Sequence, residues 1–318
     1  MTLREIALKI LEFKKVLIFS HTRPDGDTIG SSTALKTALE SKGIKADIVC
    51  DFIDLPRGLD LLKGVSEIKK PTEIDDSYDA YIAVDCSTPP VFGASYKIFE
   101  KGEQTFSIDH HVSNSRYAKY NYVKECGANT ENVYDLILEL QVPINSDIAN
   151  SILLGIVTDT GCFGHNSTTS DTLEIASILV KNGGNLSEIV KKTFKNQSRE
   201  RAKLYAKVIS GLRYYLDGQV AVIITTKNLL EECNASPTAT EGFIDFPLSI
   251  EGVEVAISLL EVNDTRYKVS FRSKGKVNVN EIASLYGGGG HVLASGAMLN
   301  GYLEDIIDKL VYNVKQRV

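Results

Sequence analysis

The sequence predicts an α/β protein of two domains, a larger one with a mostly parallel, doubly wound sheet and a smaller one with a mixed sheet. The length of 318 residues suits two domains. In the first half, short apolar runs alternate with helical patterns, as in parallel sheets. In the second half, residues 267–272 alternate polar and apolar side chains. We assign residues 1–185 to the first domain, 186–200 to a helical linker and 201–318 to the second domain.

The first domain opens with a helical pattern at residues 3–13. A second helix is predicted at residues 28–42, where Gly43 ends it, and a third at residues 171–182. Residues 152–157 are interpreted as a buried helix or a buried strand. The apolar runs predict strands at residues 16–19, 46–50, 80–84 and 105–108. Strands and helices therefore alternate along the domain, which favours a parallel sheet.

The second domain follows a long, basic helical pattern at residues 186–212, which contains the predicted linker. A helix that starts at residues 281–285 breaks at four consecutive glycines before His291. A closing helix is predicted at residues 303–314. The strands of this domain are predicted at residues 220–226, 253–261 and 267–272.

Composition excludes several classes of protein. The net charge of −6 and the pI of about 5.5 argue against a general electrostatic grip on long nucleic acid. Five scattered cysteines without a CxxC pair predict a reduced intracellular compartment, with neither a disulfide framework nor a thiolate zinc site. We find no signal peptide and no apolar run near the ~18 residues of a membrane span, so we predict a cytoplasmic protein.

Acidic and imidazole side chains follow the predicted strands and the buried segment at residues 152–157. These side chains are His21, Asp25, Asp27, Asp85, Asp109, His110, His111 and Asp159. Because ligands of parallel α/β sheets bind at the carboxyl ends of the strands, we expect these groups to lie close together. Neighbouring side chains on a strand point to opposite faces, so we expect either His110 or His111 to lie where the strand gives way to a loop.

Such a gathering of carboxylates needs a counter-charge, which divalent cations supply. Oxygen-rich sites with one imidazole each suit manganese or magnesium better than zinc. Two ions about 3.5–4 Å apart could share one bridging carboxylate and clamp a phosphate ester. The sequence therefore predicts a two-metal site at the edge of the first sheet.

A resemblance to the DHH phosphoesterase family rests on four motifs, which occur in the order HTRPDGD, VDCS, DHH and TDTG. The associated C-terminal domain of that family resembles a second segment, FRSKGKVNVNEIASLYGGGGHVLASG. In size and domain order the chain resembles a bacterial branch that degrades very short RNAs to mononucleotides and adenosine 3′,5′-bisphosphate (pAp) to AMP. Relatives in that branch also cleave the linear dinucleotide pApA. The resemblance therefore implies a metal-dependent hydrolase that acts on these substrates.

By position, the resemblance implies two divalent cations, foremost Mn²⁺, with Mg²⁺ or Co²⁺ as alternatives. The implied ligands are His21, Asp25 and Asp85 for one ion, and Asp27, Asp85, His110 and Asp159 for the other. The implied catalytic residues are Asp85, which bridges the ions, Asp109, which orients a ligand imidazole, and His111, which faces the phosphate. The implied nucleophile is a water activated by the two ions.

The resemblance also implies residues that bind the nucleotide opposite the metals. In the second domain these are Arg272, Ser273, Lys274, Gly288, Gly289, Gly290 and His291. Arginine suits bidentate phosphate contacts, and glycines let backbone N–H groups approach an anion. The cleft between the domains would then measure ligand length. In the first domain, Asn114 is a candidate phosphate contact, and His165 either contacts substrate or only hydrogen-bonds within its loop.

The sequence leaves two alternative functions open, an inorganic pyrophosphatase and a non-catalytic nucleotide-binding regulatory module. The Arg272-Ser273-Lys274 and glycine features favour a nucleotide over pyrophosphate. The complete set of metal ligands argues against a module that has lost its chemistry. An exonuclease for long strands is disfavoured by the acidic charge. The sequence leaves the oligomeric state open, with a homodimer as one option.

Overall fold

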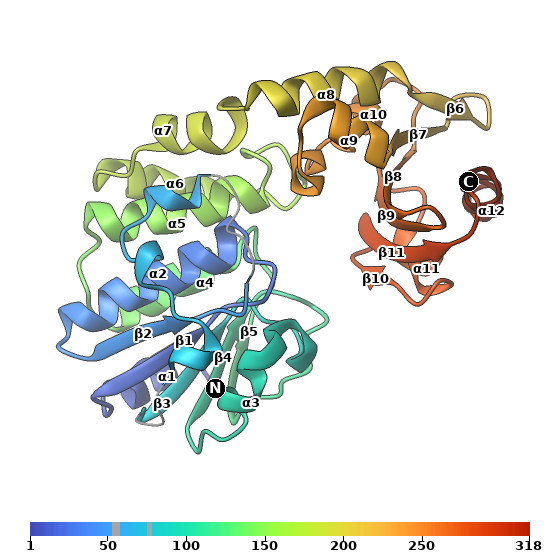
Figure 1. The fold of residues 1–318 in the computed structure, drawn as a ribbon. Helices are drawn as coiled ribbons and strands as arrows, with labels where there is room; N and C mark the ends of the chain where they lie inside the picture. The colour runs from blue at the N-terminus through green and yellow to red at the C-terminus, as the bar shows by residue number, and fades with distance from the viewer. Residues whose placement is uncertain (53–57, 75–77) are drawn as a thin grey trace. The chain divides into compact units, whose positions relative to one another are not determined.

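The computed structural model describes residues 1–52, 58–74 and 78–318, which form two compact units, Met1–Asn196 and Gln197–Val318 (Figure 1). The boundary between the units falls inside the segment 186–200. Each unit contains its own sheet, so the predicted class, a parallel α/β domain followed by a mixed α/β domain, is confirmed. In the described part of the chain, no helix combines the length and the apolar character needed to cross a membrane.

The sheet of the first unit has the order β2-β1-β3-β4-β5, and all its strands are parallel. Its strands are β1 (Lys15–Phe19), β2 (Lys45–Val49), β3 (Ala80–Val84), β4 (Thr105–Asp109) and β5 (Tyr120–Val123). β5 is absent from the prediction because it is a half-buried edge strand of sequence YNYV without an apolar run. The strand order reverses between β1 and β3, and such a point is where parallel α/β sheets bind ligands.

Both faces of this sheet are covered, because side chains of each strand alternate between two cores. Val16 and Ile18 of β1 belong to the core that lies under the long helices. Leu17 and Phe19 belong to a smaller aromatic core on the opposite face. The helices of the unit are α1 (Leu3–Ile10), α2 (Gly26–Ser41), α3 (Tyr96–Phe99), α4 (Asn129–Glu139), α5 (Ser146–Asp159), α6 (Ser170–Lys181) and α7 (Leu186–Val190). Short 3₁₀ helices span Leu59–Leu61, Val65–Glu67, Pro71–Glu73 and Pro89–Ser95.

The structure resolves one local prediction and corrects another. The segment 152–157, left open as helix or strand, lies within α5. The helical pattern at residues 186–212 is interrupted, because a π-helical turn (Lys191–Lys195) follows α7 and α8 (Arg199–Ser210) begins only at a new cap. The side chain of Ser198 supplies that cap by accepting a hydrogen bond from the Arg201 amide.

Helices α2 and α5 pack unusually closely, since glycines line their contact. A Cβ atom added to Gly26 would collide with the Thr158 side chain, and one added to Gly30 would collide with the Ser151 carbonyl oxygen. On α5, a Cβ atom added to Gly155 would lie 2.7 Å from Asp27 Oδ1. This packing brings the amino end of α2 next to the carboxyl end of α5.

The sheet of the second unit has the order β10-β11-β9-β8-β7-β6, and only its β7–β8 pair is parallel. Its strands are β6 (Arg213–Tyr215), β7 (Val220–Thr225), β8 (Val255–Asn263), β9 (Arg266–Ser273), β10 (Gly289–Gly290) and β11 (Ala294–Asn300). Its helices after α8 are α9 (Lys227–Cys233), α10 (Asp245–Ser249), α11 (Val279–Ser284) and α12 (Leu303–Lys315), with a 3₁₀ helix at Pro237–Thr240. One core, which includes Phe271 and Leu310, is distinct from a second that includes Leu204 and Phe243.

Candidate metal centre

The predicted metal ligands converge at the carboxyl edge of the first sheet. His21 follows β1, Asp85 follows β3, and β4 ends at Asp109. His110 and His111 therefore both lie beyond the strand, which satisfies the constraint that adjacent strand residues cannot share a face. Their ring centroids are 4.6 Å apart. His21 and Asp85 thus flank the switch point of the sheet, and both adjacent histidines follow the neighbouring strand β4.

Asp85 occupies the centre of this cluster. Its backbone adopts a left-handed conformation (φ 56°), which is uncommon for a residue other than glycine. Its Oδ2 lies 3.5 Å from Nε2 of His21, whereas its Oδ1 lies 3.5 Å from Nε2 of His110. The residue is only 3% exposed, and its buried Oδ1 has no hydrogen-bond partner among the residues that the structure describes. A buried, unsatisfied carboxylate oxygen is a position that a cation would stabilise.

A first group of ligand atoms comprises His21, Asp25 and Asp85, whose donor atoms lie within 4.8 Å of one another. Asp25 caps α2, because its Oδ1 accepts hydrogen bonds from the amides of Asp27 and Thr28. Its other oxygen, Oδ2, lies 3.7 Å from Nε2 of His21. The helix cap therefore orients one oxygen of Asp25 toward the cluster.

A second group comprises Asp27, His110 and Asp159 within the same limit of 4.8 Å. Nε2 of His110 lies 3.8 Å from Asp27 Oδ2 and 3.7 Å from Asp159 Oδ2. Asp27 lies in the first turn of α2, which begins two residues before the predicted start at residue 28, because Asp25 caps the helix earlier than the apolar pattern indicates. Its oxygens accept hydrogen bonds from the amides of Asn129 (2.5 Å) and Thr130 (2.8 Å) at the amino end of α4.

The tautomer of His110 follows from its hydrogen bond to the main chain. Nδ1 lies 3.2 Å from the carbonyl oxygen of Cys126, which can only accept, so Nδ1 carries the proton. Nε2 therefore presents its lone pair to Asp27, Asp85 and Asp159, as in a metal-binding imidazole. Sequence patterns could not reveal this contribution of Cys126, because a backbone carbonyl makes it.

The electrostatics of the cluster indicate a missing positive charge. Burial raises the pKa of Asp85 well above its ordinary value, and repulsion from Asp27 raises it further. Burial likewise raises the pKa values of Asp27 and Asp159. Across the described residues, the ion pairs of these three aspartates involve only histidines. The cluster of oxygen and imidazole donors therefore fits divalent cations.

The remaining predicted residues of this unit form hydrogen bonds within the protein. Asp109 is expected to orient a ligand imidazole, but it contacts His111, whose Nδ1 lies 2.8 Å from Asp109 Oδ1, whereas the predicted ligand His110 is held by the Cys126 carbonyl. Asn114, the candidate phosphate contact, donates from Nδ2 to Asp109 and accepts at Oδ1 from the Arg116 amide, and its contact with phosphate stays a prediction. His165 makes the loop hydrogen bond that the sequence allows as its alternative role, with Nδ1 3.1 Å from the Asp159 carbonyl oxygen.

The predicted nucleotide-binding residues of the second unit gather at one end of its sheet. Arg272 of β9 pairs with Ala294 of β11, and the Ala294 carbonyl accepts the His291 amide. Lys274 is exposed, and its Nζ contacts the Ile250 carbonyl oxygen. Ser273 is buried and donates to Glu254 Oε1, which gives this serine a structural hydrogen bond.

Close packing against β11 explains why two positions of this unit are glycines. Added Cβ atoms on Gly288 and Gly290 would collide with β11, and Gly290 also has φ 146°. Gly289 and Gly290 form β10, because they pair with Gly296 and Ser295. A Cβ atom added to Gly289 would make only an ordinary contact, 3.8 Å from Asn280 Oδ1.

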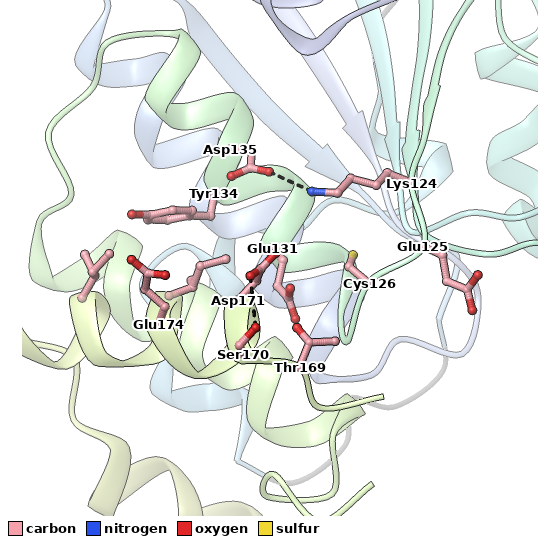
Figure 2. Close-up of a pocket in the computed structure, with 12 residues that line it drawn as sticks. Lys124, Glu125, Cys126, Glu131, Tyr134, Asp135, Thr169, Ser170, Asp171 and Glu174 are labelled. Carbon is pink, nitrogen blue, oxygen red and sulfur yellow. Dashed lines mark hydrogen bonds and ion pairs between the residues drawn. The ribbon is translucent and has the colours of Figure 1, made fainter. Parts of the chain in front are cut away.

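A separate pocket is lined by the segment that follows β5, by α4 and by the start of α6 (Figure 2). Its lining includes the carboxylates of Glu131, Asp135 and Glu174 and a single lysine, Lys124, which pairs with Asp135. None of the predicted metal ligands is among the described residues that line it. The surplus of carboxylates disfavours phosphate, so this pocket is not where we place the substrate.

The fold and this centre define a phosphoesterase of the DHH type, and comparisons with known proteins agree. The chain belongs to the DHH family, whose N-terminal domain matches residues 15–156, while the DHHA1 domain matches residues 218–318. It is therefore a hydrolase of the DHH phosphoesterase family, as the four motifs predicted.

Within the family, the chain is similar to bifunctional oligoribonuclease and PAP phosphatase NrnA of Thermus thermophilus, with 33% identity over 95% of this chain and 90% of that protein. A probable enzyme of the same name from Streptococcus mutans is 29% identical over 96% of this chain and 97% of that protein. The crystal structure of an exopolyphosphatase-related protein from Bacteroides fragilis has a TM-score of 0.93 and 28% identity, covering 99% of this chain and 96% of that one. The predicted branch of the family is thereby confirmed as the one the chain resembles.

Proposed function

We propose that this protein hydrolyses very short oligoribonucleotides, including pApA, to mononucleotides and converts pAp to AMP. The observation that carries the proposal is Asp85, because its two buried oxygens face different groups of metal ligands. The names of the two NrnA relatives support the choice of substrates. We further propose that it acts in the cytoplasm.

The centre supports hydrolysis through its own side chains. His21, Asp25 and Asp85 would hold one divalent cation, and Asp27, Asp85, His110 and Asp159 a second, with Mn²⁺ preferred over Mg²⁺ or Co²⁺. When bound, two such cations would supply an activated water and neutralise the charge of the phosphate. The Cys126 carbonyl holds His110 in the ligand tautomer, and Asp25 and Asp27 are fixed by helix amino ends.

His111 is proposed to act on the phosphate rather than on a cation. Its Nδ1 is engaged by Asp109, so a phosphate oxygen would meet Nε2. Although burial alone lowers the pKa of His111, the hydrogen bond to Asp109 and the nearby carboxylates raise it. A proton on Nε2 could then stabilise negative charge at the reacting phosphate or at its leaving oxygen.

Recognition of the nucleotide is proposed for the second unit. Arg272, Lys274, Gly289 and His291 lie at one end of its sheet and offer a guanidinium, an ammonium and backbone amides. Such groups match the charge of pAp or a short RNA, whereas the acidic charge of the whole chain disfavours long strands. Ser273 is assigned a supporting role through Glu254 and Gly275.

The proposal is tested by a turnover panel of pAp, pApA, RNAs of increasing length and pyrophosphate, each with Mn²⁺, Mg²⁺ and Co²⁺. We expect turnover of pAp and the shortest RNAs, falling as length increases. The same panel with the Asp85→Asn variant controls for contaminating nucleases. Turnover restricted to pyrophosphate would replace the proposal with a pyrophosphatase, and binding of pAp without turnover would replace it with a regulatory module.

A further inference from the structure

A short chain of hydrogen bonds begins at Asn114 and ends at His111. Nδ2 of Asn114 donates to Asp109 Oδ2 at 2.6 Å, and Asp109 Oδ1 accepts from His111 Nδ1 at 2.8 Å. Asp109 is fully buried at the end of β4, so its carboxylate depends on these donors. Each carboxylate oxygen of Asp109 therefore accepts a hydrogen bond from a different neighbour.

The orientation of the Asn114 amide is fixed independently of Asp109. Its Oδ1 accepts a hydrogen bond of 2.7 Å from the amide of Arg116. A backbone N–H can only donate, so the oxygen must face Arg116 and the NH₂ group must face Asp109. Ser107 Oγ and the Cys86 carbonyl oxygen, both 3.4 Å from Nδ2, provide weaker contacts on the same side.

We propose that Asn114 is a positioning residue, which holds Asp109 so that Asp109 holds the ring of His111 toward the substrate. The inference rests on the proposed function, in which His111 acts on the phosphate. A carboxylate bound through one oxygen alone can turn about its Cβ–Cγ bond. The donor from Asn114 prevents that rotation and so fixes the plane of the His111 ring.

A double-mutant cycle tests this order of action. The steady-state kcat is measured for wild type, Asn114→Ala, His111→Ala and the double variant, at high enzyme concentration but with substrate in excess, so that slow variants remain measurable. We expect Asn114→Ala to lower kcat by about 10–100-fold, as removal of an orienting partner does. In the His111→Ala background its effect should shrink to less than about twofold. An equal loss in both backgrounds would overturn the proposal.

A spectroscopic readout is independent of turnover. The hydrogen-bonded Nδ1 proton of His111 should give a downfield ¹H–¹⁵N NMR resonance in the metal-free protein, assigned by its absence in His111→Ala. Asn114→Ala should shift or remove this resonance, and an unchanged resonance would overturn the inference. If wild type hydrolyses nothing, the proposed function fails while the resonance still decides the role of Asn114.

Two further variants separate positioning from folding. Asn114→Asp keeps an acceptor for the Arg116 amide but places a carboxylate against Asp109, so its kcat should fall at least as much as that of Asn114→Ala. Asn121→Ala removes another asparagine, whose amide hydrogen-bonds to the backbone of Ala118, and it should retain wild-type kcat. If Asn114→Asp retained its activity, the role of Asn114 would be limited to accepting the Arg116 amide, and the proposal would be overturned.

Discussion

Gly155 of α5 faces Asp27 of α2 so closely that a Cβ atom added to it would lie 2.7 Å from Asp27 Oδ1. The same Cβ atom would lie 2.4 Å from Thr130 Cγ2, so we expect Gly155→Ala to displace both Thr130 and Asp27, weaken Mn²⁺ binding and lower the free energy of unfolding by about 1–3 kcal/mol. Calorimetric Mn²⁺ titration and urea unfolding measure the two effects. Gly211→Ala is the control, because its Cβ would meet only an ordinary contact at 3.5 Å; equal losses in both variants would contradict the argument.

Asp85→Asn should separate activity from stability. We expect hydrolysis to fall by more than about 100-fold, since a bridging ligand should matter more than its outer partners. In EDTA, however, the variant should melt at a higher temperature than wild type, because it removes a buried carboxylate whose pKa is raised by burial and by Asp27. Thermal melts with EDTA and with Mn²⁺ test this, and a less stable metal-free variant would refute it.

The difference in melting temperature between wild type and Asp85→Asn in EDTA should change with pH in one direction. The raised pKa of Asp85 means that the folded, metal-free protein binds a proton more tightly than the unfolded chain. This contribution to stability is complete below the ordinary aspartate pKa of about 3.9 and is lost as pH rises through the raised value. The melting temperature of wild type relative to Asp85→Asn should therefore fall with rising pH in EDTA. A rise would contradict the assignment.

Mn²⁺ should reverse this trend, because the ligands bind the ion without their protons. The increase in melting temperature that Mn²⁺ gives wild type should therefore grow as pH rises. Asp85→Asn should show a smaller increase at every pH. Protons released on Mn²⁺ addition, followed with a pH indicator, provide an independent measurement.

Thiol labelling should distinguish Cys162 from the other four cysteines. Cys162 is exposed, whereas Cys50, Cys86 and Cys233 are buried and Cys126 is half-buried. Burial raises the pKa of Cys50 to about 12 and also raises that of Cys126, so both remain thiols at neutral pH. Ellman's reagent should label about one thiol per native chain and all five after unfolding. Rapid labelling of Cys162→Ser would contradict this.

Arg272→Ala should raise the KM for pAp by about tenfold, as expected for loss of one charge-assisted hydrogen bond of about 1.5 kcal/mol. Mn²⁺ affinity should not change, because Arg272 belongs to the second unit and the metal ligands to the first. Lys268→Ala is the matched control, an exposed cation on the same strand at an even spacing. Equal effects of the two variants on KM would remove Arg272 from the proposed binding site.

The sequence predicted most of the first sheet and the convergence of acidic and imidazole side chains at one of its edges, because apolar runs mark strands and their polar ends mark one edge. The assignment of these side chains as metal ligands stays a prediction. It missed β5, whose half-buried edge position leaves no apolar run. It also placed Asp27 in a loop, since the cap supplied by Asp25 depends on side-chain geometry. No sequence pattern indicated the roles of Asn129 and Cys126, because their backbone atoms make the contacts.

Asp27 joins the cluster to the architecture of the unit, because the cap of α4, Ala128, has no side-chain hydrogen bond and Asp27 accepts the next two amides instead. A variant at Asp27 would thus expose an uncapped helix as well as lose a ligand. Investigators who want an inactive protein to trap a substrate complex for crystallography should therefore choose His111→Ala, which spares this junction.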